Sequence, residues 1–529
     1  MVADKGGCKR APAGSSSTLD ASDVHFLNTR SCEELMSVLT KPQRRFAGLV
    51  SELINCNPFL PDRIAIEKKI LGRSFVAKGA NWNLHPSEHQ PTDNIDRIYQ
   101  QATEILGGLE LDSADEEDWP LIVDLLYLVL FNEFRDNFES VQNDGGKSAA
   151  SVYQKFCASW EKFCPAKKVP KSVTTQRAHM FALLFQIRRA FDSTFRNLIG
   201  SSEPIIKLRA EVWRSIFTHD VRRYSTTMYA AMADFPTLIT GPTGSGKELV
   251  ARAVGQSGFV PYDEKKNSFA SPLNELFVSL NLSALSQTLI ESELFGHVKG
   301  AFTGATHDRV GWLEACPRHG AVFLDEIGEL DHDIQVKLLR VAQDRVFQRL
   351  GDTRPCTFHG RIICATNRDL AEEMAAGRFR TDFFYRLCAD QIETPSLAAR
   401  CVDGDAELGH LVEHLLQRMI GAEAVDVSGE CIAWIRSELG PKYPWPGNVR
   451  ELEQCIRSWL IRKEYRPCIQ QAAAGGKDSL ESALACSEMS ADELLTLYCR
   501  LKYEQNGSYL KTAQQLGLDR RTVKARVDA

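Results

Sequence analysis

The stretch Pro236-Thr-Leu-Ile-Thr-Gly-Pro-Thr-Gly-Ser-Gly-Lys-Glu-Leu-Val-Ala-Arg-Ala253 decides the fold of the central part of this chain. Its apolar start predicts a strand, its glycine-rich middle a loop, and the residues after Lys247 a helix. In such a P-loop the glycines let backbone N–H groups approach phosphate, and the lysine reaches the terminal phosphates. We therefore predict an α/β nucleotide-binding domain. Its expected nucleotide contacts are Gly241, Pro242, Thr243, Gly244, Ser245, Gly246, Lys247 and Glu248.

A second apolar run, Ala321-Val-Phe-Leu-Asp-Glu326, predicts a buried strand that ends in two carboxylates. Asp325 can hold Mg²⁺ and Glu326 can polarise an attacking water, as nucleotide hydrolysis requires. Taken alone, the pair could be a solvated strand end. The P-loop upstream favours the catalytic interpretation. One position departs from the general pattern, because Glu248 follows the lysine where a magnesium-binding Ser or Thr is expected.

Five segments stand out together: Gly241 to Glu248, Glu291 to Ala305, Phe323 to Leu330, Ala365 to Leu370 and Trp445 to Leu452. They resemble the AAA+ domain of bacterial sigma-54-dependent transcriptional activators, also called enhancer-binding proteins. The resemblance covers about residues 201–465 and the C-terminal tail, and it accounts for Glu248, which this family usually carries. Its most specific motif is Gly300-Ala-Phe-Thr-Gly-Ala305, which in the family contacts sigma-54.

The resemblance implies a role for each matching residue, with ATP and Mg²⁺ as cofactors. Asp325 would coordinate magnesium and Glu326 would activate water. The remaining implied roles are a switch of Glu326 for Asn281, γ-phosphate sensing for Asn367, donation to the neighbouring subunit's nucleotide for Arg380 and Arg386, nucleotide sensing from the lid for Arg450, and sigma-54 contact for Gly300, Ala301, Phe302, Thr303, Gly304 and Ala305.

Arginines supplied across an interface would make hydrolysis depend on assembly. The resemblance implies a homo-oligomeric ring, a hexamer when active. A surface ion pair is the alternative for either arginine. In the contact loop we expect Phe302 to be exposed, because an exposed aromatic between glycines is costly in a purely structural loop. A loop that moves with the nucleotide state and touches sigma-54 fits this pattern.

Two segments depart from the family. Gly258 to Asn274 resembles an insertion between the P-loop helix and the strand that leads to Asn281. A proline- and arginine-rich stretch of the family is reduced here to Thr394–Arg400. Neither departure removes a catalytic group, and both indicate a divergent branch.

Residues 21–200 are expected to form a helical regulatory region that follows a disordered tail at 1–20. Apolar residues recur at helical spacing from Phe46 to Ile54, Asn94 to Leu106, Leu121 to Phe138 and Ala178 to Leu198. The polar stretch Gln142–Ser148 is expected to join two lobes. No family is evident here. The signal that the region senses stays open, with a ligand, a partner protein or the ATPase ring itself as alternatives.

The C-terminal part predicts a helix-turn-helix at 489–529, after a linker at 466–488 and the helical AAA+ lid at 396–465. Gly517 permits the turn, and Asp519 can cap the second helix. This tail resembles the Fis-type domain of the same activators. A basic helical hairpin without DNA is the alternative. The expected double-stranded DNA contacts are Arg520, Arg521, Thr522, Lys524 and Arg526.

The 529 residues predict several domains, with the AAA+ α/β subdomain at 201–395. Fifteen cysteines without a CxxC pair favour free thiols in the cytoplasm, and no apolar run is long enough for a membrane span. Two functions remain open. One is an ATP-hydrolysing activator that binds upstream DNA and remodels sigma-54 RNA polymerase holoenzyme from the closed to the open promoter complex. The other is an AAA+ ATPase that remodels a different protein.

Overall fold

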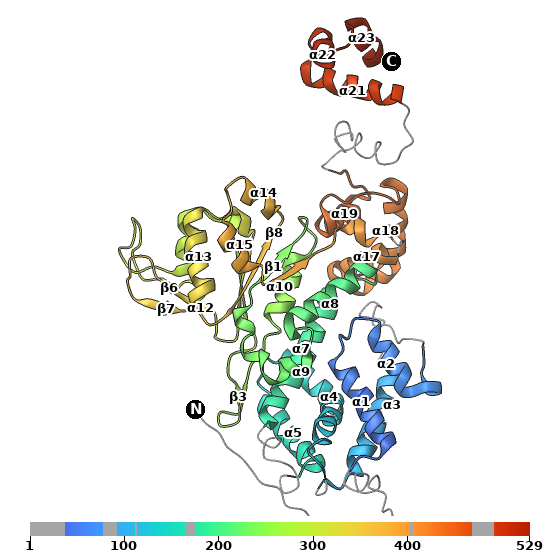
Figure 1. The fold of residues 1–529 in the computed structure, drawn as a ribbon, viewed down its shortest axis with the longest axis vertical. Coiled ribbons are helices and arrows are strands. Elements are labelled where there is room, and N and C mark those ends of the chain that lie inside the picture. The colour runs from blue at the N-terminus through green and yellow to red at the C-terminus, as the bar shows by residue number, and fades with distance from the viewer. Residues whose placement is uncertain are drawn as a thin grey trace, which may run out of the picture.

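The computed structural model describes residues 38–77, 93–111, 114–165, 176–402, 404, 406–467 and 491–528 (Figure 1). The expected tail at 1–20 and nearly all of the expected linker at 466–488 lie outside these ranges. The described part contains a helical N-terminal region, a central α/β domain, a helical lid and a helical C-terminal domain (Figure 1). This confirms the predicted fold class.

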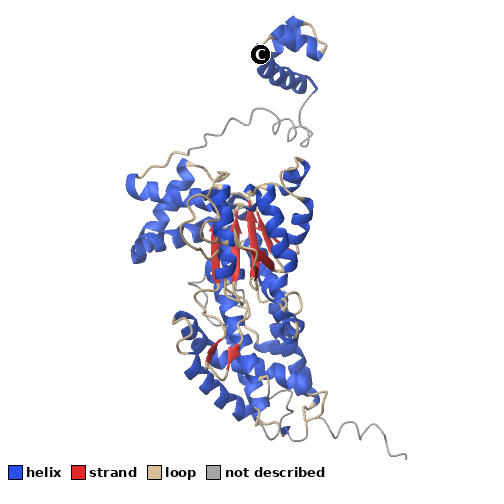
Figure 2. Ribbon diagram, turned by 90° about the vertical axis from the view of Figure 1, so that its left-hand side faces the viewer, coloured by secondary structure: helices blue, strands red, loops and turns tan. Residues whose placement is uncertain are grey.

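Five parallel strands form the central sheet, in the spatial order β4-β5-β8-β1-β9. Helices flank this sheet, as Figure 2 shows. The register places Asn281 opposite Asp325 and Thr240 opposite Thr366, so the carboxyl ends of the inner strands lie together. The strands are β1 (Thr237–Thr240), β4 (Phe277–Asn281), β5 (Ala321–Asp325), β8 (Arg361–Thr366) and β9 (Asp390–Glu393).

The two faces of the sheet belong to different hydrophobic cores, because successive strand side chains point to opposite faces. On β5, Phe323 packs into a core shared with α10 and the N-terminal helices, whereas Val322 and Leu324 pack into a core with α11, α13 and α15. Both faces are covered, so the inner strand β5 is apolar up to Asp325, whereas the edge strand β9 buries only Ile392. The helices of this domain are α10 (Lys247–Gly255), α11 (Gln287–Phe295), α12 (Trp312–Ala315), α13 (His332–Asp344), α14 (Leu370–Ala375) and α15 (Thr381–Leu387).

The N-terminal region is helical, as its apolar periodicity predicts. The expectation of two lobes is wrong. Residues 144–148 form a turn between α4 and α5, and both helices pack into one core, since short polar turns also join neighbouring helices of a single bundle. The helices are α1 (Lys41–Asn55), α2 (Asp62–Leu71), α3 (Asp93–Gly107), α4 (Trp119–Asn143), α5 (Ala149–Phe163), α7 (Arg177–Asn197), α8 (Glu203–Phe217) and α9 (Val221–Thr226).

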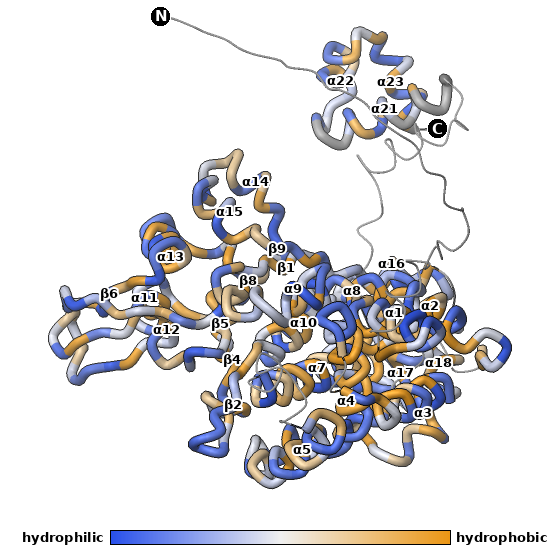
Figure 3. Tube along the Cα trace, turned by 60° about the horizontal axis from the view of Figure 1, so that its bottom comes forward, coloured by the Kyte–Doolittle hydropathy of each residue, from blue (hydrophilic) through white to orange (hydrophobic). Residues whose placement is uncertain are grey.

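The expected insertion at 258–274 forms a small hairpin of β2 (Tyr262–Asp263) and β3 (Ser268–Phe269) that packs on the N-terminal helices. The Tyr262 ring lies 4.4 Å from that of Tyr153 and 5.0 Å from that of Phe181, and the Phe269 ring lies 4.7 Å from that of Phe185. Apolar colouring runs through α4 and α7 in Figure 3. One hydrophobic core therefore continues from the N-terminal helices through this hairpin to the sheet, across the expected domain boundary at residue 201.

The lid consists of α16 (Leu397–Arg400), α17 (Ala406–Ile420), α18 (Ala424–Glu438) and α19 (Asn448–Arg462). A buried carboxylate on α17 ties it to the segment between α7 and α8. Glu407 Oε2 accepts hydrogen bonds from the amides of Ser201 at 2.7 Å and Ser202 at 2.9 Å, and Oε1 accepts one from Arg400 Nε at 2.8 Å. Arg400 also donates to the carbonyl of Ile199. The lid is thus joined to the N-terminal region as well as to the sheet domain.

The C-terminal domain has α21 (Ala491–Asn506), α22 (Tyr509–Leu516) and α23 (Arg520–Asp528) around a small core of Cys499, Ala513 and Val523. Gly517 closes α22 in the left-handed conformation with φ of 65°, which a side chain would disfavour. Asp519 Oδ1 accepts from the Arg521 amide at 2.8 Å, at the start of α23. Within the ranges described, no helix is long and apolar enough to cross a bilayer. Two antiparallel strands, β6 (Val346–Gln348) and β7 (Pro355–Thr357), complete the fold.

Candidate functional site

The predicted nucleotide-site residues meet at one edge of the sheet. The P-loop follows β1, Asp325 ends β5, Asn281 ends β4 and Asn367 follows β8. All of these strands are parallel, so their carboxyl ends share one edge, where ligands bind in open α/β sheets. The topology thus brings together residues that lie up to 126 positions apart in the sequence.

The P-loop adopts a conformation that depends on glycine. Gly241, Gly244 and Gly246 have φ of 138°, 76° and 101°, and side chains rarely adopt such values. Lys247 Nζ donates to the carbonyls of Gly241 at 3.0 Å and Pro242 at 3.3 Å. Burial lowers the pKa of Lys247, opposed by the carboxylates of Glu326 and Asp325. A buried ammonium and a curved glycine loop fit the phosphates of a nucleotide.

Two further P-loop residues, Ser245 and Glu248, form hydrogen bonds with other residues of this domain. Ser245 Oγ lies 2.7 Å from the Pro242 carbonyl, to which it donates, and 2.6 Å from Thr394 Oγ1, which fixes the loop to the segment after β9. Glu248 is exposed and accepts from Arg252 one helical turn later, at 3.1 Å. Glu248 therefore has a local partner on α10.

The carboxylates of Asp325 and Glu326 lie next to Lys247 in a partly buried site. Burial, followed by repulsion from Glu326, raises the pKa of Asp325, while Lys247 acts in the opposite direction. Glu326 is held in the left-handed conformation, with φ of 57° and ψ of 51°. Non-glycine residues in this region are strained and concentrate at functional sites. Such a position fits the water-activating role that the sequence implies for Glu326.

Asn367 bridges Glu326 and the P-loop. Its amide donates to Glu326 Oε2 at 3.3 Å, and its Nδ2 donates to Thr243 Oγ1 at 2.7 Å. A displacement of the P-loop would therefore be transmitted through Asn367 to the carboxylate of Glu326. This geometry fits the γ-phosphate sensing that the sequence implies for Asn367, which stays a prediction.

Asn281 lies opposite Asp325 in the strand register, but its side chain has a local partner. Its Oδ1 accepts from the Ser283 amide at 3.0 Å and from Ser283 Oγ at 2.8 Å, at the start of a 3₁₀ turn. The implied contact between Asn281 and Glu326 is therefore not made in this state. Its switching role stays a prediction.

The lid closes over the P-loop through a residue that the sequence did not single out. Asn448 Nδ2 donates to the Thr243 carbonyl at 2.9 Å, and its Oδ1 accepts from the Leu397 amide at 2.8 Å. A Cβ on Gly244 would lie 2.3 Å from the Gly447 carbonyl, so only glycine fits there. The predicted sensor Arg450 is exposed at the start of α19, beside this contact. The sequence could have identified Asn448, because this residue lies in the same Trp-Pro-Gly-Asn motif that indicated Arg450.

The two predicted trans-acting arginines lie at α15 and are accessible. Arg380 precedes the helix and pairs with Asp382, with Nη2 to Oδ2 at 2.7 Å. Arg386 is exposed, and no ion-pair partner for it occurs among the residues that the structure describes. Both arginines are therefore accessible to a neighbouring subunit.

The loop Gly300–Ala305 is a compact turn. The Gly300 amide donates to the Ala305 carbonyl at 2.9 Å, and the Ala305 amide donates to the Phe302 carbonyl at 3.0 Å. Gly300 and Gly304 have φ of 86° and 100°, and a Cβ added at either position would meet no atom within 4 Å. Conformation rather than space therefore requires glycine at both positions. Thr303 is exposed at the tip.

The expectation that Phe302 is exposed is wrong. Its side chain is half-buried, and its ring meets the His297 ring edge-on at a centroid distance of 4.9 Å. His297 is buried and bonded to Ser292 Oγ through Nδ1 at 2.8 Å. The motif alone does not indicate this contact, because the histidine lies outside it. An apolar contact, rather than exposure, therefore holds the aromatic ring in this state.

The β6-β7 hairpin forms hydrogen bonds with the residues just before the loop Gly300–Ala305. The Val298 amide donates to the Leu350 carbonyl at 3.1 Å, and the Leu350 amide donates to the Gly296 carbonyl at 2.9 Å. Gly351 lies so close to Ala301 that a Cβ there would approach to 2.8 Å. The hairpin thus fixes the base of the loop and leaves its tip accessible.

The predicted DNA contacts lie on or beside one helix but differ in accessibility. Val523 is fully buried, and α23 is amphipathic around it. Arg526 is half-buried, and its Nη1 donates to Thr496 Oγ1 on α21 at 3.0 Å, so it also holds the domain together. The exposed residues are Arg520, Arg521, Thr522 and Lys524.

Comparisons with known proteins agree with this site. Residues 218–393 match the family described as Sigma-54 interaction domain. The chain is 39% identical over 269 residues to the regulatory protein LuxO of Vibrio cholerae, covering 51% of this chain and 44% of LuxO. It is 38% identical over 302 residues to the transcriptional regulatory protein ZraR of Salmonella typhimurium, covering 56% of this chain and 64% of ZraR. Both matches thus leave much of each relative uncovered.

Among solved structures, NtrX from Brucella abortus aligns with a TM-score of 0.38 and 24% identity, over 68% of this chain and 73% of that one. This similarity is too low to support an argument of its own. The sequence matches carry the assignment instead, because the matched residues include the P-loop, both carboxylates and the loop at 300–305. Residues 218–393 of this chain thus match the Sigma-54 interaction domain family over the whole of the nucleotide site at the sheet edge.

Proposed function

We propose that this chain is an ATP-hydrolysing transcriptional activator that binds double-stranded DNA and remodels sigma-54 RNA polymerase holoenzyme from the closed to the open promoter complex. One observation carries the proposal. The accessible Thr303 turn projects from the domain in which Asn367 joins the catalytic carboxylate Glu326 to the P-loop residue Thr243. The proposed effector loop and the proposed nucleotide sensor thus lie in one α/β domain. We place the activity in the cytoplasm, where a promoter complex is found.

The residues at the sheet edge supply the groups that nucleotide binding requires. Lys247 and the P-loop amides would hold the phosphates of ATP, and Asp325 would hold Mg²⁺, which neutralises charge on the phosphates when bound. Glu326 would accept a proton from water at its carboxylate. Asn367 fixes that carboxylate through its amide at 3.3 Å, so the base is oriented by the residue that also contacts Thr243.

Turnover in this proposal requires assembly into a homo-oligomer, a hexamer when active. We assign Arg380 and Arg386, which are accessible at α15, to the nucleotide of a neighbouring subunit, whereas Arg450 lies beside the P-loop of its own chain. Arginines contributed by a neighbour stabilise charge in the transition state. DNA binding through α23 would raise the local concentration of subunits at the promoter.

The experiment that tests the proposal measures sigma-54 binding by the purified chain with ADP and a metal-fluoride phosphate mimic. Thr303→Ala should abolish binding and promoter opening but leave ATP turnover largely unchanged. Thr306→Ala is the matched control, because Thr306 is an exposed threonine close by, outside the motif. We expect it to bind like the unmodified chain.

The outcomes separate the two candidate functions. Binding that depends on the nucleotide mimic and on Thr303 supports the activator. Intact ATPase activity without sigma-54 binding by the unmodified chain would contradict it, and would favour an AAA+ ATPase that remodels another protein. Loss of ATP turnover in Thr303→Ala would contradict the role of the loop as an effector separate from the catalytic groups.

A further inference from the structure

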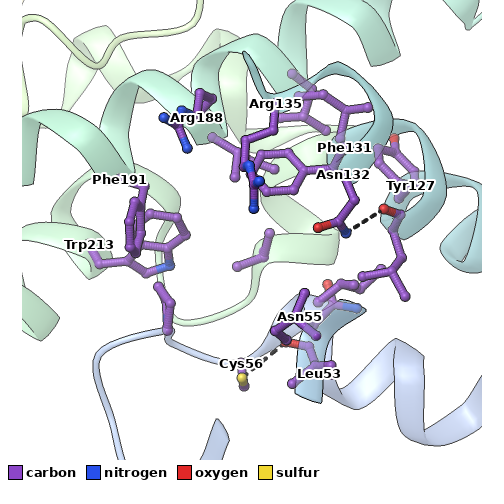
Figure 4. Close-up of a pocket in the computed structure, with 18 of the residues that line it drawn as sticks. Leu53, Asn55, Cys56, Tyr127, Phe131, Asn132, Arg135, Arg188, Phe191 and Trp213 are labelled. Carbon is purple, nitrogen blue, oxygen red and sulfur yellow. Dashed lines mark hydrogen bonds between the residues drawn. The ribbon is translucent and has the colours of Figure 1, made fainter. Parts of the chain in front are cut away.

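The N-terminal region contains a cavity of about 470 Å³ that the nucleotide site does not use (Figure 4). It lies among α4, α7 and the C-terminal end of α1, with α8 and α9 completing the wall. Side chains in protein interiors interdigitate and leave few voids larger than a water molecule. A space of this size within the range of small-molecule sites is therefore a candidate for a ligand.

The lining of the cavity is mostly apolar and partly aromatic. Tyr127 and Phe131 come from α4, Phe191 from α7 and Trp213 from α8, and Figure 4 shows them around the cavity. Rigid rings supply large contact areas at low entropic cost. The walls thus favour a ligand with a compact apolar body.

Arginines reach the cavity from several helices, but most of them already have acidic partners. Arg188 pairs with Glu139 and Asp192, both at 2.9 Å, and Arg222 pairs with Asp124. These pairs are part of the packing of the region. They leave no reason to expect a further anion beside them.

Arg135 differs from these arginines. Its only hydrogen bond among the described residues is a long one, from Nε to Oδ1 of the adjacent Asp136 at 3.4 Å, and Asp136 is 86% exposed. The two terminal nitrogens of its guanidinium make no contact with a protein acceptor in the described ranges. Figure 4 shows Arg135 and Arg188 on the same side of the cavity. A planar fork of donors matches the two oxygens of a carboxylate.

Asn132 supplies a second polar group next to Arg135 on α4. Its Nδ2 is used within the helix, donating to the Leu128 carbonyl at 2.9 Å, which leaves Oδ1 as an acceptor. Figure 4 shows this amide at the wall of the cavity. The site therefore has a cationic fork, a nearby acceptor and an apolar interior, the combination that fixes the orientation of a small amphipathic molecule.

We propose that this cavity binds a small carboxylic acid with an aromatic or branched apolar body, its carboxylate on Arg135 and its body among Phe131, Phe191 and Trp213. This binding site does not depend on the proposed function. It makes residues 38–226 a sensor for a metabolite of this class rather than only a docking surface for another protein.

The wall of the cavity is also positioned to report occupancy to the nucleotide site. On α7, Leu183, Leu184 and Ile187 line the cavity, while Gln186 donates to the Ser257 carbonyl at 2.8 Å and Arg189 donates to the Gly258 carbonyl. Ser257 and Gly258 closely follow α10, the helix that begins at Lys247. A ligand that moves α7 would thus move the end of the P-loop helix. This part of the inference rests on the proposed function.

The test titrates the full chain, without nucleotide, with 3-phenylpropanoate by isothermal calorimetry. The neutral 3-phenylpropan-1-ol is the matched ligand control, since it keeps the apolar body and lacks the carboxylate. We expect saturable 1:1 binding of the acid, and binding of the alcohol weaker by about tenfold or more, as for loss of one charge-assisted hydrogen bond. No saturable binding of the acid at about 10 mM, well above the ~1 mM Kd of a weak small-molecule site, or equal affinity for acid and alcohol, would overturn the proposal.

Two variants locate the site. Arg135→Gln should weaken the binding of the acid by about tenfold or more and leave the affinity for the alcohol unchanged. Arg45→Gln makes the same exchange on the exposed face of α1, away from the cavity lining, and should bind like the unmodified chain. Ile187→Trp should fill the cavity and abolish binding of both compounds, with an unchanged circular dichroism spectrum. Equal affinity in Arg135→Gln and the unmodified chain would place the carboxylate elsewhere and overturn the assignment.

A separate measurement tests the report to the nucleotide site. Saturating 3-phenylpropanoate should change the ATP turnover of the unmodified chain and leave that of Arg135→Gln unchanged. Unchanged turnover in the unmodified chain, with binding shown by calorimetry, would overturn the transmission through α7. A chain without ATPase activity would instead contradict the proposed function, and the calorimetric result would stand on its own.

Discussion

Arg380 is held by Asp382 of its own chain, with Nε 3.0 Å from Oδ1 and Nη2 2.7 Å from Oδ2. This bidentate pair is exposed and lies at the start of α15. An arginine that serves a neighbouring nucleotide must exchange this carboxylate for phosphate. In the proposed function, this pair is a resting arrangement that assembly would break.

The first prediction concerns complementation between two inactive variants. Arg380→Ala should lower ATP turnover by about 10³, because an arginine finger contributes that much, and Glu326→Gln should also be inactive. A 1:1 mixture should regain activity, since about a quarter of the interfaces would combine an intact site with an intact arginine. Steady-state ATPase assays of the mixture check this. An inactive mixture, with mixed assembly shown by crosslinking, would show that Arg380 acts within its own chain.

The second prediction concerns the pH dependence of stability without nucleotide. Burial and Glu326 raise the pKa of Asp325, so the folded chain disfavours its charged form. That penalty is complete at pH values above the raised pKa and disappears as the pH falls through it. Asp325→Asn should therefore raise the melting temperature at pH 8 by about 2 °C and lose this advantage as the pH is lowered.

Differential scanning fluorimetry from pH 8 down to about 4, close to the ordinary pKa of an aspartate, measures this difference. Asp344→Asn, at the exposed end of α13, is the matched exchange outside the site. A gain from Asp325→Asn that is the same at every pH would contradict the electrostatic explanation.

The third prediction concerns the link between the N-terminal helices and the ATPase core. Phe185 is 1% exposed on α7, and its ring contacts Phe138 and the hairpin residue Phe269. Phe185→Ala should lower the free energy of unfolding by about 3–5 kcal/mol, as for other large-to-small core changes. Phe235 is 38% exposed, so Phe235→Ala should lower the free energy of unfolding far less.

Denaturant unfolding measures both changes. Because one core is shared, ATP should also slow hydrogen exchange in α7 of the unmodified chain. A hydrogen-exchange rate in α7 that is the same with and without ATP would contradict the coupling between the N-terminal helices and the nucleotide site.

The fourth prediction concerns DNA binding by α23. Arg521 is exposed, whereas Arg526 donates to Thr496 within the domain. Arg521→Ala should weaken DNA binding and reduce the slope of log affinity against log salt by about 0.9, as for one lost phosphate contact. Fluorescence anisotropy at several salt concentrations gives this slope. An unchanged slope would show that Arg521 does not face phosphate.

Much of the site could be predicted from the sequence because its parts are local. A strand, a glycine loop and a helix in succession define the P-loop, and an apolar run ending in Asp325 and Glu326 defines the neighbouring strand. Helical spacing likewise predicted α1, α3, α4 and α7. In these segments, residues close in the sequence determine the structure.

The remaining features depend on contacts between distant segments. The segment at 258–274 was identified as an insertion, but nothing local shows that Tyr262 and Phe269 pack on the N-terminal helices. In the sequence, Arg400 and Glu407 resemble exposed charged residues on helices. In the structure they form a buried pair, because the segment 198–202 packs against them. Phe302 was expected to be exposed for the same reason, since His297 covers it from outside the motif.

The continuous core has a consequence for how the chain can be shortened. Removal of residues 38–200 would strip Tyr262 and Phe269 of the Phe181 ring that contacts both, and would expose the apolar side chains that share this core. Such a fragment would aggregate rather than run as an unrestrained enzyme. Deletion therefore cannot reveal whether the N-terminal helices restrain or stimulate the ATPase, and that question needs point changes that leave the core intact.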